Sequence, residues 1–212
     1  MTASHPRRVT FFHSPQSRSG GVLALLEELG AQYELRALDL RRGEQRNEAY
    51  LAVNPMGKVP AVVHDGALVT EQGAIYAYLA DLYPEAGLAP AIGDRLRGPY
   101  LRWLFFYGSS FEPALVDRSM KREPAPPSTC PYGDYETMLR TLTDQLARGA
   151  YLLGDRFTAA DMLWGGALRW TTMFKLVPEL PLIADYVKRV TSRPSFARAA
   201  KIDADLLAAR GA

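Results

Sequence analysis

Two hydrophobic periods alternate along the first part of the chain. Residues 9–12 form a short apolar run between Arg8 and a Ser-Pro pair, as a buried strand does. Residues 22–29 place apolar side chains at helical spacing, and Gly30 follows where a helix commonly ends. Residues 32–37 then alternate polar and apolar side chains, which predicts a half-exposed strand. The predicted order is strand, helix, strand.

A second group of elements follows a polar stretch. A short helical pattern at residues 49–53 leads into a loop at residues 54–58, which contains Asn-Pro and Gly. Two β-like runs, at residues 59–64 and 67–70, are joined by an Asp-Gly pair, a strong hairpin signal. Residues 75–82 return to helical spacing. The N-terminal part is therefore predicted to be an α/β unit of the order βαβ-α-ββα.

The strand pattern stops near residue 94. Five helical segments are predicted after it, at residues 95–107, 132–148, 159–176, 182–191 and 196–209. Thr158 and Asp161 have the spacing of a capping box, which predicts a helix start at that point. The change near residue 94 from mixed strand and helix patterns to helical patterns alone indicates a domain boundary. We expect one domain at residues 1–85, a linker at 86–93, and an all-helical domain at 94–212.

Composition narrows the class of protein. The chain has 212 residues, 48% hydrophobic and 23% charged, with a net charge of +2, which is typical of a globular protein. So small a net charge favours neither a nucleic-acid nor a membrane partner. Residues 1–8 lack the apolar core of a secretory signal, so we expect a cytoplasmic protein. Cys130 is the single cysteine, which excludes a disulfide within the chain.

Polar residues gather in the loop between the first strand and the first helix. Residues 14–21 read Ser-Pro-Gln-Ser-Arg-Ser-Gly-Gly. Unpaired main-chain N–H groups and the positive end of the helix dipole favour an anion at such a place. A serine hydroxyl there could donate a hydrogen bond to a thiolate. On this loop alone, an ordinary N-cap is the simpler interpretation of Ser17 or Ser19.

Two further loops carry candidate binding residues. Pro60 follows Lys58 and Val59 at the start of a predicted strand. A cis bond before Pro60 would turn the main chain of Val59 outward for pairing with an extended peptide, and an ordinary trans bond is the alternative. Glu71, at the start of the next helix, either complements the helix dipole or holds a ligand amine.

Together these loops resemble the glutathione transferase family. The resemblance rests on Asn-Pro-Met-Gly-Lys-Val-Pro-Ala-Val at residues 54–62, on Leu-Val-Thr-Glu-Gln-Gly at 68–73, and on Phe-Thr-Ala-Ala-Asp at 157–161. The resemblance covers nearly the whole chain. Within the family, the chain is similar in these motifs to serine-type bacterial members with a theta- or zeta-like N-terminal domain. The resemblance implies a thioredoxin-like N-terminal domain, an all-helical C-terminal domain and a homodimer.

The resemblance also implies roles for particular residues. Ser17 matches the position of the family's catalytic serine, and Ser14 and Ser19 are the alternative candidates for that role. The residues implied in glutathione binding are Gln45, Arg46, Lys58, Val59, Pro60, Glu71 and Gln72. Gln72 departs from the serine that the family commonly has there. Its main-chain N–H and its side-chain amide can still donate to the γ-glutamyl end of glutathione.

The implied activity is conjugation of the glutathione thiolate to small hydrophobic electrophiles, with glutathione as co-substrate and no metal. Tyr107 and Phe111, in the helical domain, are candidates for the electrophile pocket. Glutathione-dependent peroxidase, reductive dehalogenase or isomerase activity is an alternative. A non-catalytic ligand-binding or interaction module is another, because fold alone does not decide function.

Overall fold

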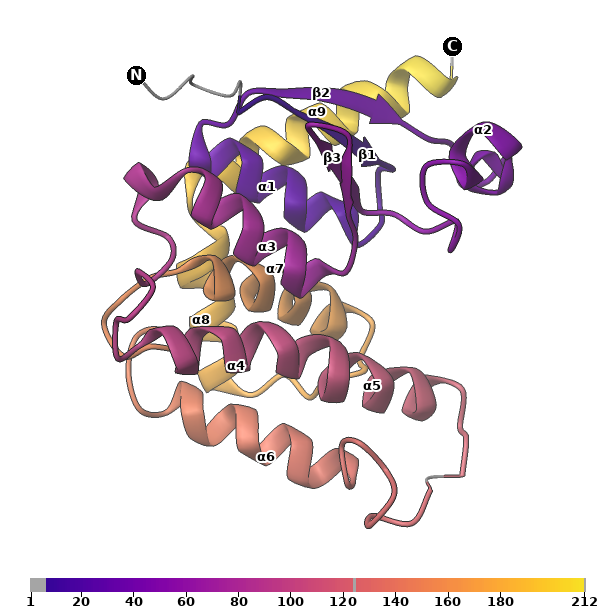
Figure 1. Cartoon of the computed structure of the whole chain (residues 1–212). Coiled ribbons are helices and arrows are strands. Elements are labelled where there is room, and N and C mark those ends of the chain that lie inside the picture. Colours follow the sequence, from indigo (N-terminus) through magenta and orange to yellow (C-terminus); the bar gives the residue numbers. More distant parts are fainter. Residues whose placement is uncertain (1–6, 124, 212) are drawn as a thin grey trace. The chain divides into compact units, whose positions relative to one another are not determined.

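The computed structural model describes residues 7–123 and 125–211 of the chain (Figure 1). Residues 1–6, which belong to the segment expected to contain no secretory signal, lie outside the described residues. The described chain forms two compact units. The first unit contains the residues up to 86 together with those from 193 onward, and the second contains residues 87–192. The first unit therefore takes its last helix from the far end of the chain.

The first unit is built on a four-stranded mixed sheet. Its strands are β1 (Val9–His13), β2 (Tyr33–Ala37), β3 (Ala61–His64) and β4 (Ala67–Val69), in the order β2-β1-β3-β4. β1 runs parallel to β2 and antiparallel to β3, and β3 is antiparallel to β4. The turn between β3 and β4 is the predicted hairpin, since Asp65 and Gly66 both have positive φ, 48° and 78°.

Helices pack beside this sheet in the first unit. They are α1 (Ser19–Leu29), α3 (Gln72–Leu82) and α9 (Pro194–Gly211), and α1 contacts both of the others (Figure 1). The short elements η1 (Glu44–Arg46), α2 (Glu48–Leu51) and η2 (Pro84–Ala86) lie in the connections. α1 ends as predicted at Gly30, which has a left-handed φ of 60° and donates its N–H to the carbonyl of Leu26.

Ion pairs attach α9 to α1. Arg193 Nε lies 2.9 Å from Glu28 Oε1, and Arg198 Nε lies 2.8 Å from Glu27 Oε2. The partners are 165 and 171 residues apart in the sequence, so no local pattern predicts them. Packing thus groups α9 with the sheet rather than with the helices before it. The division into domains at residues 1–85 and 94–212 stays a prediction.

The second unit is helical, as expected. Its elements are α4 (Arg97–Phe106), a π-helical turn η3 (Tyr107–Phe111), α5 (Glu112–Ser119), α6 (Tyr135–Leu146), α7 (Ala159–Met173) and α8 (Pro181–Thr191). α5 was not predicted, because Gly108 and Pro113 resemble helix breakers. Pro113 lies at the start of α5, directly after η3, and the backbone stays helical through this junction. Trp103 and Trp164 form the centre of the core, with the Trp164 indole donating to the Trp103 carbonyl over 3.0 Å.

The predicted capping box at the start of α7 is confirmed. Thr158 N donates to Asp161 Oδ2 over 2.9 Å, and Leu152 N donates to Asp161 Oδ1 over 2.8 Å. The hydroxyl of Tyr186, on α8, also donates to Asp161 Oδ1 over 2.9 Å. Burial raises the pKa of the Asp161 carboxyl, although these donors oppose the rise. One buried side chain therefore ties α7 to its preceding loop and to α8.

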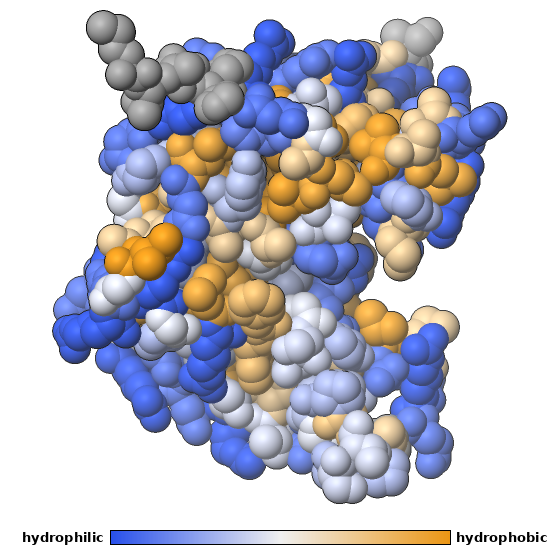
Figure 2. All heavy atoms as spheres, in the orientation of Figure 1, coloured by the Kyte–Doolittle hydropathy of each residue, from blue (hydrophilic) through white to orange (hydrophobic). Residues whose placement is uncertain are grey.

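Hydrophilic residues cover most of the face that Figure 2 shows, with hydrophobic residues between them in smaller patches. Among the helices of the described residues, none combines the length and the hydropathy that a membrane span requires.

Candidate functional site

The loop after β1 places three serines at the start of α1. Ser14 and Ser19 are buried, with 2% and 0% of their surface exposed, whereas Ser17 is partly exposed. Ser17 Oγ accepts a hydrogen bond from Ser19 N over 3.2 Å and donates to the carbonyl of Ser14 over 2.7 Å. The first turn of α1 contains no acidic residue of its own. Of the three serines, Ser17 is the one that a ligand can reach.

Two residues behind this loop, His13 and Asp203, were not predicted from the sequence. His13, the last residue of β1, is fully buried, and its Nε2 lies 2.7 Å from Asp203 Oδ1 on α9. The Nδ1 atom of the same ring lies 2.8 Å from Ser19 Oγ. A histidine at a buried strand position next to a serine-rich loop was a usable signal. Asp203, 190 residues away, offered none.

The loop before β3 is held in one conformation by side chains. Tyr50 OH and Asn54 Nδ2 both donate to the carbonyl of Lys58, over 2.5 and 2.8 Å. Burial raises the pKa of Tyr50, which keeps its hydroxyl protonated as a donor. The Val59–Pro60 peptide bond is cis. Val59 is partly buried and Lys58 is exposed.

Gln45 and Arg46 lie against the same loop. A Cβ atom added to Gly57 would stand 2.7 Å from the Gln45 carbonyl and 3.0 Å from Arg46 Nη1, so only glycine allows this approach. Arg46 Nη1 also donates to the carbonyl of Met56 over 3.4 Å. Gln45 Oε1 is buried and has no hydrogen-bond partner among the described residues. The structure therefore brings these two predicted residues to the loop that contains Lys58 and Val59.

Glu71 adopts an unusual backbone conformation at the start of α3. Its φ is 60° and its ψ is 120°, a region that a residue with a side chain seldom occupies. Such strain is commonly retained where a site requires it. Glu71 is exposed, and Gln72 after it is partly buried.

The sheet register gathers these loops at one edge. β1 and β3 are antiparallel, with Phe12 opposite Ala61, and β3 and β4 are antiparallel as well. The carboxyl end of β1, the amino end of β3 and the carboxyl end of β4 therefore meet at the same edge. Those three ends lead into the loops with Ser17, Val59 and Glu71. Three loops singled out from the sequence thus lie at the same edge of the sheet in the first unit.

Comparison with known proteins decides the family. The family model described as "Glutathione S-transferase, N-terminal domain" matches residues 7–81, and "Glutathione S-transferase, C-terminal domain" matches residues 134–194. The chain belongs to the glutathione S-transferase family of enzymes. The resemblance drawn from the loops and the capping box is therefore confirmed, and so is the combination of a thioredoxin-like sheet with a helical C-terminal part.

Relatives of this family member cover most of its length. "Glutathione S-transferase GstA" of Escherichia coli O157:H7 is 31% identical over 86% of this chain and 92% of its own. "Disulfide-bond oxidoreductase YfcG" of Escherichia coli K12 is 27% identical over 90% of this chain and 94% of its own. A sphingomonad glutathione S-transferase, solved in complex with glutathione, is 32% identical with a TM-score of 0.74 and covers 92% of this chain and 98% of its own.

The two candidates for the electrophile pocket lie inside the helical core of this family member. Phe111 is 0% exposed and its ring centroid is 4.8 Å from that of Trp164, while Tyr107 is 3% exposed and its hydroxyl donates to Glu112. Both belong to the π-helical turn η3. Side chains so deeply packed stabilise the core of the second unit, and their contact with an electrophile stays a prediction.

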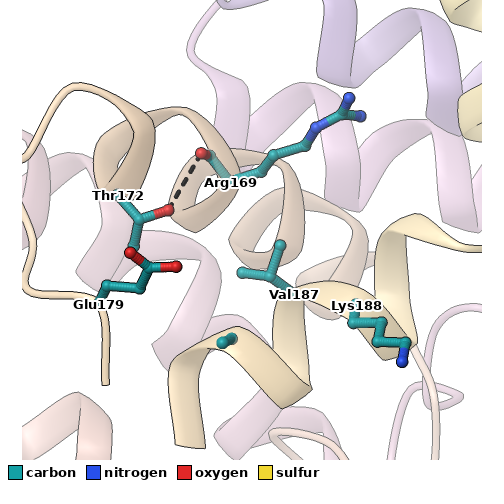
Figure 3. Close-up of a pocket in the computed structure, with 6 residues that line it drawn as sticks. Arg169, Thr172, Glu179, Val187 and Lys188 are labelled. Carbon is teal, nitrogen blue, oxygen red and sulfur yellow. Dashed lines mark hydrogen bonds between the residues drawn. The ribbon is translucent and has the colours of Figure 1, made fainter. Parts of the chain in front are cut away.

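A surface pocket of about 220 Å³ in the second unit is unrelated to the predicted residues. It is lined by α7, α8 and the segment between them, through Arg169, Thr172, Glu179, Ala184, Val187 and Lys188 (Figure 3). Its volume is below the ~300 Å³ at which ligand pockets usually begin. Figure 3 shows the charged ends of Arg169 and Lys188 extending away from Glu179, so they do not converge on one point. Within the described residues, no group of three His, Cys, Asp or Glu side chains has the arrangement of a metal site.

Proposed function

We propose that this enzyme conjugates glutathione to small hydrophobic electrophiles, and that Ser17 holds the glutathione sulfur as a thiolate. The observation that carries the proposal is the position of Ser17. It is the partly exposed member of the three loop serines, at the start of α1 and at the sheet edge that also carries Val59 and Glu71. The sphingomonad relative, which is solved with glutathione, supports the choice of ligand.

The chemistry requires a stabilised thiolate. A free thiol has a pKa near ~8.5, so most of it is protonated at neutral pH and is a poor nucleophile. A hydroxyl that donates to the sulfur, together with the positive end of α1, favours the anion and lowers the thiol pKa. The thiolate then attacks an electrophilic carbon and forms a C–S bond. In a substitution, the bond to the leaving group breaks and that group departs with the electron pair; in an addition, the π electrons move to the far atom of the acceptor, which then takes up a proton.

The remaining predicted residues would hold the peptide part of glutathione. Val59 would pair its main chain with the cysteinyl residue, as an added strand pairs with a sheet edge. Glu71 would bind the γ-glutamyl ammonium group, with the main-chain N–H of Gln72 directed at the neighbouring carboxylate. The side chains of Gln45 and Arg46 would bind the glycine carboxylate, with the Lys58 ammonium group adding positive charge, and Pro60 would hold the main chain of Val59 in place.

Retention on immobilised glutathione tests the binding part of the proposal. We expect the enzyme to be retained and to be eluted by free glutathione, and we expect Glu71→Gln to reduce retention. A conjugation assay with an aryl halide then tests turnover. Failure to bind glutathione would remove the whole site assignment, and binding without turnover of any substrate would favour a ligand-binding module.

Reduction by glutathione is the second candidate, supported by the likeness to "Disulfide-bond oxidoreductase YfcG". The same thiolate would attack a disulfide or a peroxide instead of a carbon atom. Cys130 is buried in the second unit and the serine loop contains no cysteine, so glutathione would supply the reactive sulfur. Assays with a glutathione mixed disulfide and with a peroxide distinguish this activity from conjugation.

The proposal includes a homodimer in the cytoplasm. Light scattering at micromolar concentration tests the dimer directly, because a monomer and a dimer differ twofold in mass.

A further inference from the structure

A chain of hydrogen bonds connects α9 to the loop that holds Ser17. It begins with the contact of 2.7 Å between Asp203 Oδ1 and His13 Nε2. It continues over 2.8 Å from His13 Nδ1 to Ser19 Oγ, and over 2.7 Å from Ser19 Oγ to Ser17 Oγ. His13 and Ser19 are 0% exposed, so the middle of the chain is closed to solvent. Its two ends, Asp203 and Ser17, are partly exposed.

The hydroxyl protons in this chain can point in either of two directions. Ser17 and Ser19 have one hydroxyl proton each, and Ser14 N already donates to Ser19 Oγ over 3.0 Å. With a carboxylate at Asp203, the Nε2 atom of a neutral His13 carries the proton, and Nδ1 accepts. Ser19 then donates to His13. The single hydroxyl proton of Ser17 stays within the loop, directed at Ser19 Oγ or at the carbonyl of Ser14, which both lie 2.7 Å from Ser17 Oγ. In the free enzyme, the Ser19 proton therefore points toward His13, and the Ser17 proton is not directed at a sulfur atom.

We propose that His13 receives, through Ser17 and Ser19, the proton that the thiol of glutathione loses; this inference rests on the proposed function. The S–H bond breaks as a new O–H bond forms at Ser17. Ser17 passes its own proton to Ser19, and Ser19 passes its proton to Nδ1 of His13. The products are a thiolate and an imidazolium, so atoms and charge balance without a further reactant. Every bond in the chain has reversed, and Ser17 now donates to the thiolate.

Asp203 stabilises the imidazolium that this step creates. The groups in contact with the imidazole are Asp203 from α9, Ser19 from α1 and, at a ring distance of 5.5 Å, Phe11 from β1. Among the described residues, the Asp203 carboxylate is the charged group paired with the ring, and 23% of its side chain is exposed. Its second oxygen lies 3.7 Å from the place that a Cβ on Gly20 would occupy, beside the first turn of α1. Asp203, His13 and Ser19 are positioning residues, because Ser17 alone would touch the sulfur.

NMR of the imidazole nitrogens of His13, in the intact enzyme at neutral pH, tests the step directly. We expect a proton on Nε2 alone in the free enzyme and on both nitrogens after glutathione is added. S-methylglutathione, which has no thiol proton, is the matched ligand and should leave Nδ1 unprotonated. A ring that is doubly protonated before glutathione is added, or unchanged while thiolate absorbance shows a bound thiolate, would overturn the relay.

The variant Asp203→Asn tests the same step through the sulfur. We expect it to raise the pKa of the bound thiol by about one pH unit or more, because the imidazolium loses its counter-charge. Asp205→Asn, on the same helix and paired with Lys201 at the surface, is the matched control and should leave the thiol pKa unchanged. In a Ser17→Ala background, Asp203→Asn should have no further effect.

The outcomes separate the relay from the proposed function. If Ser17→Ala raises the thiol pKa and Asp203→Asn does not, the relay is wrong and the role of Ser17 stands. If neither variant changes the thiol pKa, the role of Ser17 is wrong as well. An enzyme that does not bind glutathione at all would overturn the proposed function itself. The NMR measurement needs no variant, so the relay stays testable even if Asp203→Asn fails to fold.

Discussion

The strained backbone of Glu71 is a feature of the candidate site that lowers stability and therefore points to a role in function. Glu71 is held at φ 60° and ψ 120°, a conformation that raises the free energy of the folded state by about 1–3 kcal/mol for a residue with a side chain. Glycine would relieve that strain, so the presence of glutamate at this position favours a role for its carboxylate.

We expect Glu71→Gly to weaken glutathione binding by about tenfold or more, because a charged hydrogen bond to the γ-glutamyl ammonium group is lost. The free energy of unfolding should stay the same or rise by up to ~1 kcal/mol. Calorimetric titration and urea unfolding measure the two effects. Asp65→Gly, at the positive φ of 48° in the hairpin, is the control that changes strain outside the site. Equal glutathione affinity in both variants would argue against a binding role for Glu71.

The attachment of α9 to α1 is the feature that matters most at the level of elements. Burial raises the pKa of Glu28, but its hydrogen bonds with Arg193 and the charges of Arg193 and Arg198 outweigh that effect and lower the pKa below its ordinary value of 4.5. A lowered pKa in the folded state means that ionisation favours folding. The contribution is present above the ordinary pKa and is lost as the pH falls through the folded-state value.

Glu28→Gln should therefore reduce the free energy of unfolding at neutral pH by about 1–2 kcal/mol, since the Glu28 side chain is only 13% exposed. The difference from the unsubstituted enzyme should shrink as the pH falls below 4.5 and vanish only below the lowered folded-state pKa. Denaturant unfolding at several pH values measures this. Asp205→Asn, in an exposed pair, should change little. A constant difference across the pH range would contradict the ion-pair explanation.

The start of α7 gives a second prediction at this level. Asp161→Ala leaves the N–H groups of Leu152 and Thr158 and the hydroxyl of Tyr186 without their acceptor inside the core. We expect the free energy of unfolding to fall by about 3 kcal/mol, measured by denaturant unfolding. Asp155→Ala, at an exposed position in the preceding loop, is the control. A loss no larger than that of the control would show that the buried carboxylate contributes little.

At the scale of the whole molecule, sequence periodicity predicts where helices and strands lie in the chain better than it predicts which of them pack together. The strands, the hairpin, the end of α1 at Gly30 and the capping box all follow from local residue patterns. The place of α9 does not, because its contacts join charges far apart in the chain. α5 was missed because a proline in a first helical turn looks like a helix end in the sequence.

In the candidate site, too, the loops could be predicted from the sequence, whereas contacts between distant residues could not. The loops with Ser17, Val59 and Glu71 could be singled out from residue types, and the strand register explains why they meet. His13 and Asp203 could not be paired from the sequence, since only packing brings α9 beside the end of β1. Phe111 belongs to a π-helical turn that places its ring in the core of the second unit, a packing that no local sequence pattern predicts. Its contact with an electrophile stays a prediction.

The central claim is that Ser17 stabilises a glutathione thiolate, and the pH titration of thiolate absorbance in the enzyme–glutathione complex tests it most directly. We expect the bound thiol to have a pKa below the ordinary value of ~8.5, and Ser17→Ala to raise it by about one pH unit or more. Ser119→Ala, an exposed serine on α5, is the control and should titrate like the unsubstituted enzyme. A Ser17→Ala complex that binds glutathione and titrates at an unchanged pH would contradict the claim.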